Sequence, residues 1–391
     1  MHILEIPSFF PPYGGLFCLD QAKALQALGH EVRILSNVQL AVTIGIKDYL
    51  CLPYRRYEHD LEGVTIFQSY QRGIPKVVRW NVNKWVSIVQ SMFDEYVQRY
   101  GRPDILHAHC AKWAGYAAML IGREYGIPYV ITENMPYYNL HEELGEPPST
   151  VWQVDLLKHS YMEAMMVISV SKELIDDTAC YFGRDYRWTF ISNIIDTQYF
   201  HYKARPSREG RPFRFCCPAI FTWRKGYDVL LAAFDQMENQ EAELHIAGHG
   251  TDSLPFRRMV EGLHAADRVM VYGDRDRAEI RQMLYESDAL VLATRGEVQP
   301  IVLLEAMSTG MPVISTECVP ASERIEGGCT IVPVDDVQAL ASAMDRMVSA
   351  SPVDGRRLSS AIQHLASREV VSRQVEAVLL EAIGRYASLQ R

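Results

Sequence analysis

The stretch DALVLATRGEVQPIVLLEAMSTGMPVIST, residues 288–316, predicts a strand, a loop, a helix and a second strand in succession. Residues 289–293 are a short apolar run bounded by polar residues, which is typical of a buried parallel strand. Pro300 suits the first position of a helix, because its missing N–H would have no intrahelical partner there. The helix is expected to end at Gly310, and residues 312–316 form the next strand.

Two carboxylates flank the start of this helix, Glu297 in the loop and Glu305 eight residues later. A helix N-terminus offers free N–H groups and the positive end of the helix dipole, so it commonly binds phosphate. Carboxylates beside a phosphate make sense if they accept hydrogen bonds from hydroxyl groups of the same ligand, as in a sugar nucleotide. Alternatively, Glu297 interacts with the helix dipole and Glu305 is a solvated helix residue. This stretch alone leaves both interpretations open.

Length and composition indicate two globular domains. The chain has 391 residues, of which 48% are hydrophobic and 22% are charged, and this is enough for two separate cores. The net charge of −9 argues against a general nucleic-acid-binding protein. The eight cysteines show no CxxC pairing, so no zinc ribbon is indicated and reduced thiols are expected. With no signal peptide and no apolar run of about 18 residues, we expect a cytoplasmic location or a peripheral position on the inner membrane face.

Strands and helices alternate through both halves of the chain. This alternation predicts an α/β protein with two doubly wound parallel sheets that face a central cleft. Residues 201–212, HYKARPSREGRP, are polar and basic and contain two prolines and a glycine, so we expect an interdomain linker there. The expected domains are therefore residues 1–200 and 213–370, and residues 371–391 form a C-terminal helix.

Residues 104–109, DILHAH, are expected to form a strand that ends in two histidines on the same side, His107 and His109. Two histidines at this spacing can bind a metal ion, but no third ligand follows closely, so no metal site is expected. A histidine at the carboxyl end of a strand can instead face a ligand cleft. The alternative for His109 is a core histidine whose hydrogen bonds are satisfied within the protein.

Two further positions are candidates for contact with an anion. Gly14 and Gly15 precede an expected helix, where glycine lets the backbone approach a bound anion closely, although a simple turn explains the pair as well. Lys225 precedes Gly226 at an expected loop-to-helix junction. It can contact a phosphate there, or it can be a solvated lysine near a turn.

Two segments of the first half have a composition that suggests contact with a further partner. Residues 71–90 carry four basic residues, no acidic residue, and Trp80 and Trp85 among apolar residues. This composition predicts contact with an anionic membrane surface, and a core helix with one basic face is the alternative. Residues 135–148 are expected to form a long aromatic and acidic loop.

Nine motifs then occur along the chain in a fixed order: PYGG at 12–15, LGHEV at 28–32, DILHAH at 104–109, VS at 170–171, Asn193 with Asp196 and Phe200, KG at 225–226, AGHG at 247–250, Glu297 with Glu305, and AM with GMPVI at 306–314. With these motifs the chain resembles the retaining GT-B glycosyltransferases of family GT4, the glycosyltransferases group 1. The resemblance covers nearly the whole length and is strongest in the second half.

The resemblance implies two Rossmann-like domains, with a nucleotide sugar bound mainly by the second. It implies that Lys225 binds the diphosphate, that Glu305 binds the ribose hydroxyls, and that Glu297 with the backbone after it binds the donor sugar. It implies no divalent metal and no other cofactor. The implied catalytic residues are His109, Glu297 and Lys225, and the implied donor-binding residues are Gly15, Arg224, Lys225, Gly248, Glu297, Ile301, Val302 and Glu305.

Two positions depart from the pattern of this family. The family often carries a Gly-Arg pair six to seven residues before Lys225, where this chain has Pro218 and Ala219. Half of the usual diphosphate clamp is therefore missing unless Arg224 replaces it. The family also commonly reads E-G-F-G where this chain has Glu297-Val-Gln-Pro300, so the backbone at 300 has no N–H to donate.

The predicted function is the transfer of a hexose, with retention, from a UDP- or GDP-linked sugar to a hydroxyl of a glycan or lipid-linked acceptor. We expect front-face attack by the acceptor hydroxyl, since no carboxylate near the E-x7-E motif is poised as a nucleophile. One alternative is a sugar-nucleotide 2-epimerase of the same fold. Another is a non-catalytic binding component of a polysaccharide assembly.

Overall fold

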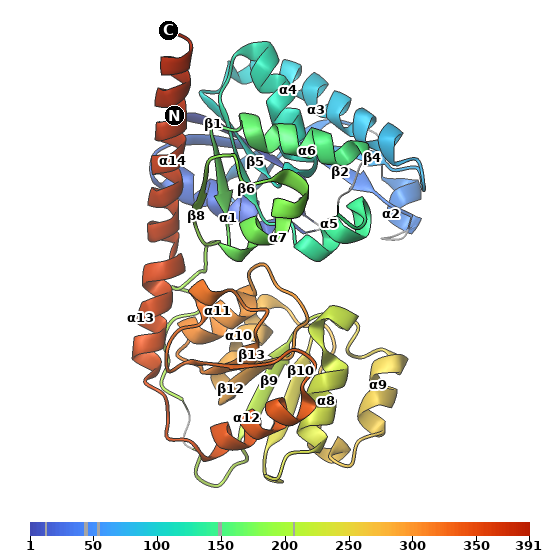
Figure 1. Ribbon diagram of the computed structural model, residues 1–391, viewed down its shortest axis with the longest axis vertical. Helices are drawn as coiled ribbons and strands as arrows, with labels where there is room; N and C mark the ends of the chain where they lie inside the picture. The colour runs from blue at the N-terminus through green and yellow to red at the C-terminus, as the bar shows by residue number, and fades with distance from the viewer. Residues whose placement is uncertain (12–13, 43–45, 53–54, 148–150, 206–207) are drawn as a thin grey trace. The chain divides into compact units, whose positions relative to one another are not determined.

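The computed structural model describes residues 1–11, 14–42, 46–52, 55–147, 151–205 and 208–391. Within these residues the chain divides into two compact α/β units. Unit 1 consists of Met1–Ile194 and Arg368–Arg391, and unit 2 consists of Ile195–Ser367 (Figure 1). The prediction of two α/β units with mostly parallel sheets is confirmed. Residues 12–13 of the PYGG motif and residues 206–207 of the expected linker lie outside the described residues.

The described part of unit 1 contains an eight-stranded sheet with the order β3-β4-β2-β1-β5-β6-β7-β8. Its strands are β1 His2–Pro7, β2 Glu31–Leu40, β3 Tyr57–Leu61, β4 Val64–Arg72, β5 Ile105–His109, β6 Tyr129–Glu133, β7 Met166–Ser169 and β8 Trp188–Phe190. Its helices are α1 Leu16–Ala27, α2 Ile46–Cys51, α3 Val78–Tyr100, α4 Tyr116–Tyr125, α5 Tyr137–Leu144, α6 Trp152–Glu163, α7 Glu173–Phe182 and α14 Arg368–Leu389.

The prediction was a parallel sheet, but strand β3 pairs antiparallel to β4, so this sheet is mixed. The two strands are joined by Glu62 and Gly63, whose φ angles are 52° and 85°. Two central residues with positive φ are typical of a two-residue β-hairpin turn, and such a turn necessarily reverses the chain. Asn-Gly or Asp-Gly is the usual sequence signal for this turn, and Glu-Gly is a weaker one.

Each face of the unit 1 sheet packs against its own helices. On one face Leu4 and Leu106 pack with buried residues of α3, α4 and α6. On the other face Ile3 and Ile105 pack with buried residues of α1 and α14. The period-two alternation of a strand therefore separates two cores, and the C-terminal helix is part of unit 1.

The division between the units falls after residue 194, where the sequence suggested 200, and the expected linker is partly built into unit 2. Phe200 is fully buried in the unit 2 core. The guanidinium of Arg205 donates to the carbonyl oxygens of Ser287 at 3.3 Å and Thr309 at 2.8 Å. The proline, glycine and basic content of this segment suggested a linker, but these hydrogen bonds attach it to the domain.

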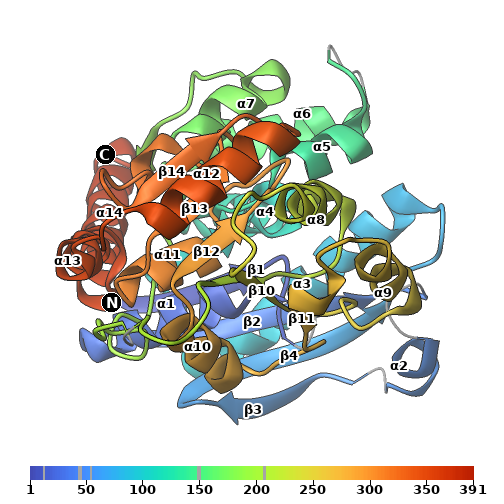
Figure 2. The same cartoon turned by 90° about the horizontal axis from the view of Figure 1, so that it is seen from below.

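The described part of unit 2 contains a six-stranded parallel sheet with the order β11-β10-β9-β12-β13-β14 (Figure 2). Its strands are β9 Arg214–Pro218, β10 Glu243–Ala247, β11 Val269–Val271, β12 Ala289–Leu292, β13 Val313–Thr316 and β14 Cys329–Val332. Its helices are α8 Tyr227–Asp235, α9 Leu254–Glu261, α10 Arg277–Glu286, α11 Ile301–Ser308, α12 Val337–Ser349 and α13 Gly355–Ala366. Strand, loop, helix and strand over residues 288–316 are confirmed, with Pro300 one position before the helix.

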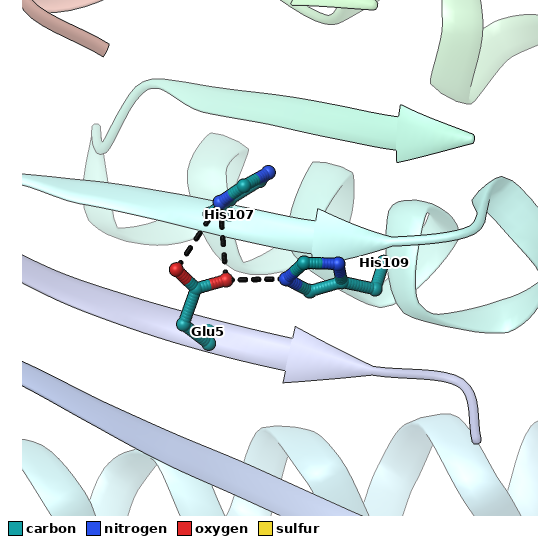
Figure 3. A group of neighbouring side chains, drawn as sticks. All are labelled: Glu5, His107 and His109. Atoms are coloured by element: carbon teal, nitrogen blue, oxygen red, sulfur yellow. Dashed lines mark hydrogen bonds and ion pairs between the residues drawn. The ribbon is translucent and has the colours of Figure 1, made fainter. Parts of the chain in front are cut away.

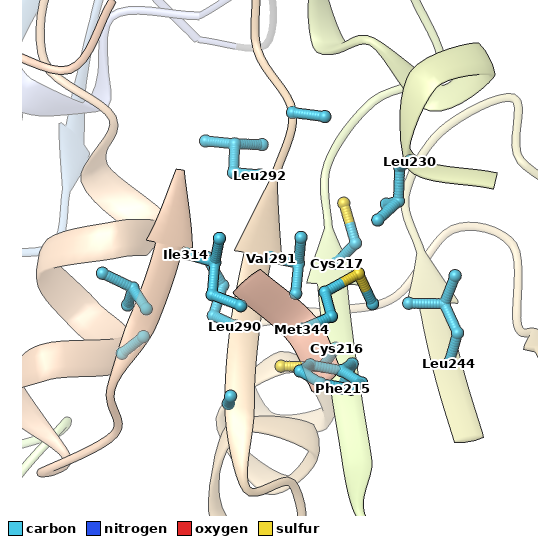
Figure 4. Close-up of a cluster of buried hydrophobic side chains, with 14 of the residues drawn as sticks. Phe215, Cys216, Cys217, Leu230, Leu244, Leu290, Val291, Leu292, Ile314 and Met344 are labelled. Carbon is cyan, nitrogen blue, oxygen red and sulfur yellow. The ribbon is translucent and has the colours of Figure 1, made fainter. Parts of the chain in front are cut away.

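The central strands of unit 2 are buried on both faces, as the uninterrupted apolar runs in their sequence indicate. Phe215 and Cys216 of β9 and Leu290 and Val291 of β12, neighbours that point to opposite faces of the sheet, are at most 1% exposed, and Met344 of α12 packs against the same core (Figure 4). Burial raises the pKa of the Cys217 thiol to about 12, so this thiol remains protonated at neutral pH.

The segment 135–148 is not the long loop that its composition suggested. Helix α5 occupies Tyr137–Leu144 within it, and residue 148 lies outside the described residues. Leu140 and Leu144 are buried, and their spacing of four residues puts them on one face of the helix. Packing of this face against the unit 1 core explains why a helix forms among so many polar residues.

Candidate functional site

A close backbone contact in unit 2 brings Lys225 to the loop that follows β12. Gly226 has a φ of 62°, and a Cβ atom at this position would lie 1.8 Å from the carbonyl oxygen of Ala293. Only glycine allows the two backbones to approach this closely. The N–H of Arg295 also donates to the carbonyl of Arg224 at 2.7 Å. The turn at 223–226 is thereby held against the carboxyl end of β12.

At this contact Lys225, Arg224 and Glu297 form an ion-pair cluster. Lys225 Nζ lies 2.5 Å from Glu297 Oε1, and Arg224 Nη1 lies 3.3 Å from Glu297 Oε2. The hydroxyl of Thr294 donates to Glu297 Oε1 at 2.9 Å. The side chains of Lys225 and Glu297 are only 12% and 6% exposed. Three residues that the sequence singled out therefore lie together, and Lys225 and Glu297 are shielded from solvent, while 27% of the Arg224 side chain is exposed.

The cluster carries a net positive charge beside the N-terminus of α11. Two cations face one carboxylate, and the first turn of α11 has neither an acidic residue nor a side-chain cap. Ile301 and Val302 are the first two residues of this helix, where N–H groups have no intrahelical partner. Glu305 lies on the next turn and is half-buried. This arrangement favours an anion next to a carboxylate that can accept hydrogen bonds.

Gly248, at the end of β10, and Ala219, at the end of β9, are in close backbone contact. Gly248 has a φ of 138°, and a Cβ atom there would lie 2.1 Å from the carbonyl oxygen of Ala219. The N–H of Ala219 in turn donates to the carbonyl of Ala247 at 2.9 Å.

Arg224, the candidate to replace the missing arginine, donates to the carbonyl of Gly296 at 3.0 Å and pairs with Glu297.

Arg295 holds the same loop from the other side, and the sequence gave no reason to select it. It pairs with Asp228 of α8 and with Asp335, both at 2.7 Å, and its guanidinium lies 4.7 Å from the centre of the Trp223 ring. The hydrogen bond from Arg295 lowers the pKa of Asp228. These contacts fix the loop between β12 and α11, and with it the position of Glu297.

In unit 1, Gly15 occupies the position before α1 with a φ of 83°. A Cβ atom there would lie 2.0 Å from the carbonyl oxygen of Phe9, so the local backbone alone demands glycine. His109 ends β5 and is 1% exposed. Its ring lies 5.8 Å from that of Phe17, centre to centre, at the start of α1.

Glu5 of β1 joins the two histidines that end β5, and the sequence analysis missed it (Figure 3). Glu5 Oε2 lies 3.0 Å from His107 Nδ1 and 2.5 Å from His109 Nε2. The three candidate ligand atoms lie within 4.8 Å of one another, so a third potential ligand comes from a neighbouring strand and not from the residues that follow His109 in the sequence. Glu5 comes from the neighbouring strand, and its one sequence signal is an acid within an apolar strand.

A second buried acid fixes the segment that follows His109. Glu133, at the end of β6, accepts hydrogen bonds from the N–H of Ala111 at 2.9 Å, the N–H of Met135 at 2.7 Å and the hydroxyl of Tyr161 at 2.5 Å. Burial raises the pKa of Glu133. The backbone just after β5 is therefore anchored to β6 at the edge of the sheet where His109 lies.

A cavity of about 530 Å³ in unit 2 is separate from these residues. Its lining includes Phe213, Asp288, Pro312 and Gly328, which directly precede β9, β12, β13 and β14. It therefore lies at the amino ends of these strands, whereas the cluster of Lys225, Arg224 and Glu297 follows their carboxyl ends. None of the predicted donor-binding residues lines this cavity.

Residues 71–90 divide into a buried and an exposed part. Val82, Trp85, Val86 and Val89 of α3 are buried in the unit 1 core, which agrees with the alternative of a core helix for this portion. The segment 74–80 is exposed, and Trp80 is 43% exposed. Among the described residues, no helix has the length and apolar character needed to cross a membrane.

Two sequence profiles of glycosyltransferases match the chain. Residues 14–199 match the profile described as Glycosyltransferase Family 4, and residues 212–350 match the profile described as Glycosyl transferases group 1. Together the two matches span most of both units.

Individual proteins agree with these profiles. The chain is 27% identical over 389 residues to glycogen synthase of Mycobacterium tuberculosis, covering 94% of this chain and 91% of that protein. It is 24% identical over 363 residues to TuaC of Bacillus subtilis, named as a teichuronic acid biosynthesis glycosyltransferase, covering 88% and 89%.

Solved structures share the fold at low sequence identity. Sucrose-phosphate synthase of Thermosynechococcus elongatus superposes with a TM-score of 0.78 at 18% identity, covering 98% of this chain and all of that one. Anabaena HepE in complex with UDP-glucose gives 0.70 at 16% identity, covering 97% and 100%. With profiles of one family matched in both units, the chain belongs to the group 1 glycosyltransferases of family 4, and its fold is GT-B.

Proposed function

We propose that this glycosyltransferase moves a hexose from a UDP- or GDP-linked sugar to a hydroxyl of a glycan or lipid-linked acceptor, in polysaccharide or glycolipid synthesis. The observation that carries the proposal is the shielded cluster of Lys225, Arg224 and Glu297 next to the start of α11. Two cations and a helix N-terminus suit a diphosphate, and the carboxylates of Glu297 and Glu305 suit sugar hydroxyls. The complexes of HepE with UDP and with UDP-glucose support a nucleotide-sugar donor.

The proposed reaction proceeds with retention and without a metal ion. The acceptor hydroxyl attacks the anomeric carbon from the face that the diphosphate leaves, and the diphosphate takes the proton of that hydroxyl. Lys225 and the N–H groups that start α11 stabilise the charge that develops on the diphosphate. Glu297 is unsuited as a nucleophile, because Lys225, Arg224 and Thr294 already surround its carboxylate. A trapped glycosyl-enzyme intermediate would contradict this mechanism.

The test is an incubation of the protein with UDP- and GDP-sugars and a panel of glycan and lipid-linked acceptors. We expect release of nucleoside diphosphate together with a glycoside whose anomeric configuration, read by NMR, matches that of the donor. Activity should be unchanged by EDTA. Formation of a C2 epimer would favour the epimerase, and calorimetry without detectable binding of any donor would favour a non-catalytic component.

We also propose that the exposed segment 74–80 contacts an anionic membrane surface and so brings the protein to a lipid-linked acceptor. Lys76 and Arg79 lie beside the exposed side chains of Ile74, Val77 and Trp80. Basic and aromatic side chains together bind the interface of anionic bilayers, at about 1 kcal/mol for each basic residue. The neighbouring Arg72 is excluded from this surface, because it donates to the carbonyl oxygens of Leu50 and Leu52.

Reversing the two charges should abolish this binding. We expect the parent protein to sediment with vesicles that contain phosphatidylglycerol, and Lys76→Glu with Arg79→Glu to reduce the bound fraction at least tenfold at low salt. The matched control is Arg257→Glu with Arg258→Glu, an exposed basic pair on α9 of unit 2. Equal binding by both double variants would locate the contact elsewhere.

A further inference from the structure

The cavity in unit 2 lies at the edge of the sheet opposite to the cluster of Lys225, Arg224 and Glu297. Its volume of about 530 Å³ is far larger than the water-sized voids of a packed interior, and it falls within the range of ligand sites. Among its lining residues Phe213 and Gly328 are buried, whereas Arg346 and Val353 are exposed. The cavity therefore has a buried floor and a rim that faces solvent.

Three arginines line this cavity, and none of them pairs with a carboxylate among the described residues. They are Arg205, Arg208 and Arg346. The acidic residue of the lining, Asp288, is neutralised by Arg211, whose guanidinium donates to both carboxylate oxygens at 2.8 Å. The lining therefore carries an excess of positive charge.

The competing explanation is that these arginines serve only to cap helices. Arg205 donates to the carbonyl oxygens of Ser287, just after α10, at 3.3 Å and of Thr309, just after α11, at 2.8 Å. Arg208 donates to the carbonyl oxygen of Val348, in the last turn of α12, at 3.0 Å. Cations are favourable at these helix ends, but each end is equivalent to only about half an elementary charge. Three helix ends therefore offset about half of the three guanidinium charges, and a net positive charge remains.

Two of the arginines have hydrogen-bond donors that the protein does not use. The Nε of Arg205 is buried and has no hydrogen-bond partner among the described residues, although both terminal nitrogens donate. Burial also lowers the pKa of Arg205, because it disfavours the charged form. The guanidinium of Arg346, in the last turn of α12, forms no hydrogen bond or ion pair within the described part of the chain. Unused donors on cations favour a ligand with an anionic group.

Much of the remaining lining is apolar. It includes the side chains of Phe213, Pro312, Met347 and Val353. The guanidinium carbon of Arg208 lies 5.3 Å from the centre of the Phe213 ring, so a cation and an apolar surface are adjacent. An inorganic anion would leave this apolar surface in contact with water. The lining therefore suits a molecule that has an apolar body as well as an anionic group.

We propose that this cavity binds a small organic anion, whose phosphate or carboxylate group contacts the arginines and whose aromatic or aliphatic body fills the apolar part. Guanidinium groups bind both kinds of anion through paired hydrogen bonds. The site is distinct from the donor site, because the four residues of β12, about 13 Å in length, separate the cavity from the loop that carries Glu297. The inference concerns unit 2 alone and does not depend on the proposed function.

Binding of 1-naphthyl phosphate tests the proposal, because this probe combines an anionic group with an aromatic body. We expect calorimetry to give a dissociation constant of about 1 mM or less, which a ligand of this size reaches at ordinary efficiency. 1-Naphthol and inorganic phosphate each carry one half of this chemistry, and each should bind at least about tenfold more weakly. 1-Naphthoate in the same assay identifies whether the site prefers a carboxylate or a phosphate.

The methyl group of Met347 reports where the probe binds, since Met347 lines the cavity. In protein with ¹³C-labelled methionine methyl groups, 1-naphthyl phosphate should shift the NMR signal of Met347, which Met347→Leu assigns. The signal of Met119, in the core of unit 1, should not move. UDP or GDP at millimolar concentration should leave the shift of Met347 in place, because these nucleotides are expected at the opposite edge of the sheet.

Arg208→Gln with Arg346→Gln should weaken the binding of 1-naphthyl phosphate at least about tenfold, because both substitutions remove charge from the cavity. Both side chains are exposed, so the variant is expected to fold. The matched control is Arg257→Gln with Arg258→Gln, an exposed pair on α9 that does not line the cavity. It should change the dissociation constant less than about twofold.

Four outcomes would overturn the proposal. The first is the failure of both naphthyl anions to bind at millimolar concentration, and the second is equally tight binding of 1-naphthol. The third is an unchanged affinity in the variant that lacks both cavity arginines. The fourth is a bound probe that leaves the signal of Met347 unshifted or that UDP or GDP displaces, since the probe would then occupy another site.

Discussion

Lys225→Ala is expected to lower transferase activity roughly 100- to 1,000-fold, the effect of removing one group that stabilises charge in a transition state. Lys225 is the closest cation to Glu297, at 2.5 Å, and only 12% of its side chain is exposed. Its ammonium group would stabilise the charge of a bound diphosphate. The site is shielded from solvent, so this electrostatic interaction is stronger than one made by a lysine on the surface. Steady-state rates of nucleoside diphosphate release measure the loss, and calorimetry with the donor shows how much of it lies in binding.

The substitution of Lys225 also leaves the shielded carboxylate of Glu297 with Arg224 as its remaining ion-pair partner. The free energy of unfolding therefore has to be measured in parallel. Removing one partner of a buried ion pair can cost about 3–5 kcal/mol. Lys23→Ala is the matched control, because Lys23 also pairs with a glutamate at 2.5 Å but lies in unit 1 with an exposed partner, Glu62. Lys225→Arg keeps the charge and the pairing in case the alanine variant is unfolded. Full activity of a folded Lys225→Ala protein would disprove the assigned role.

Gly226→Ala should destabilise unit 2 by roughly 2–5 kcal/mol, the sum of a left-handed φ and an overpacked contact. The new methyl group would lie 1.8 Å from the carbonyl oxygen of Ala293, so the turn has to move away from β12. This movement would also displace Lys225 from Glu297, and activity should fall along with stability. Urea unfolding gives the change in free energy, and the rate at saturating donor gives the effect on the site.

Gly327→Ala separates the cost of a left-handed backbone from the cost of the contact with Ala293. Gly327 lies in the same unit with a φ of 77°, and no atom lies within 4 Å of its ideal Cβ position. Its substitution should cost only the backbone term of roughly 1–2 kcal/mol and leave activity unchanged. Equal destabilisation by the two variants would mean that the contact between Gly226 and Ala293 relaxes without cost. The structural link between the turn and the site would then be wrong.

The sequence predicted the elements of unit 2 well, because its central strands are buried on both faces and its helix boundaries carry strong signals. Ala289–Leu292 is an apolar run between polar residues, Val313–Thr316 begins with two β-branched apolar residues, and Pro300 and Gly310 bracket the helix between them. Such signals act within a few residues, so they can be read without knowledge of the rest of the chain. The family resemblance then added roles to residues that the pattern only marked as unusual.

The predictions that failed involve contacts between distant segments. The turn at 62–63 reverses the chain and makes β3 antiparallel, and the helix α5 forms because Leu140 and Leu144 have a core to pack against. Arg205 is part of unit 2 because backbone carbonyls some 80 to 100 residues away accept its hydrogen bonds. Composition suggested only a loop at 135–148 and a linker at 201–212, and strand alternation suggested parallel pairing throughout.

The sequence by itself determined the α/β architecture, the division into two halves and the candidate donor residues. The architecture and the division depend on hydrophobic periodicity, glycine, proline and spacing, which are local properties, whereas the roles of the candidate donor residues are what the resemblance to the family implies. Only the tertiary structure decided which of these residues meet. Lys225 and Glu297 are 72 residues apart, and Glu5 and His109 are 104 apart. Their pairing depends on the order of strands in each sheet, since β9 lies beside β12 and β1 beside β5, and strand order is set by the packing of the whole domain.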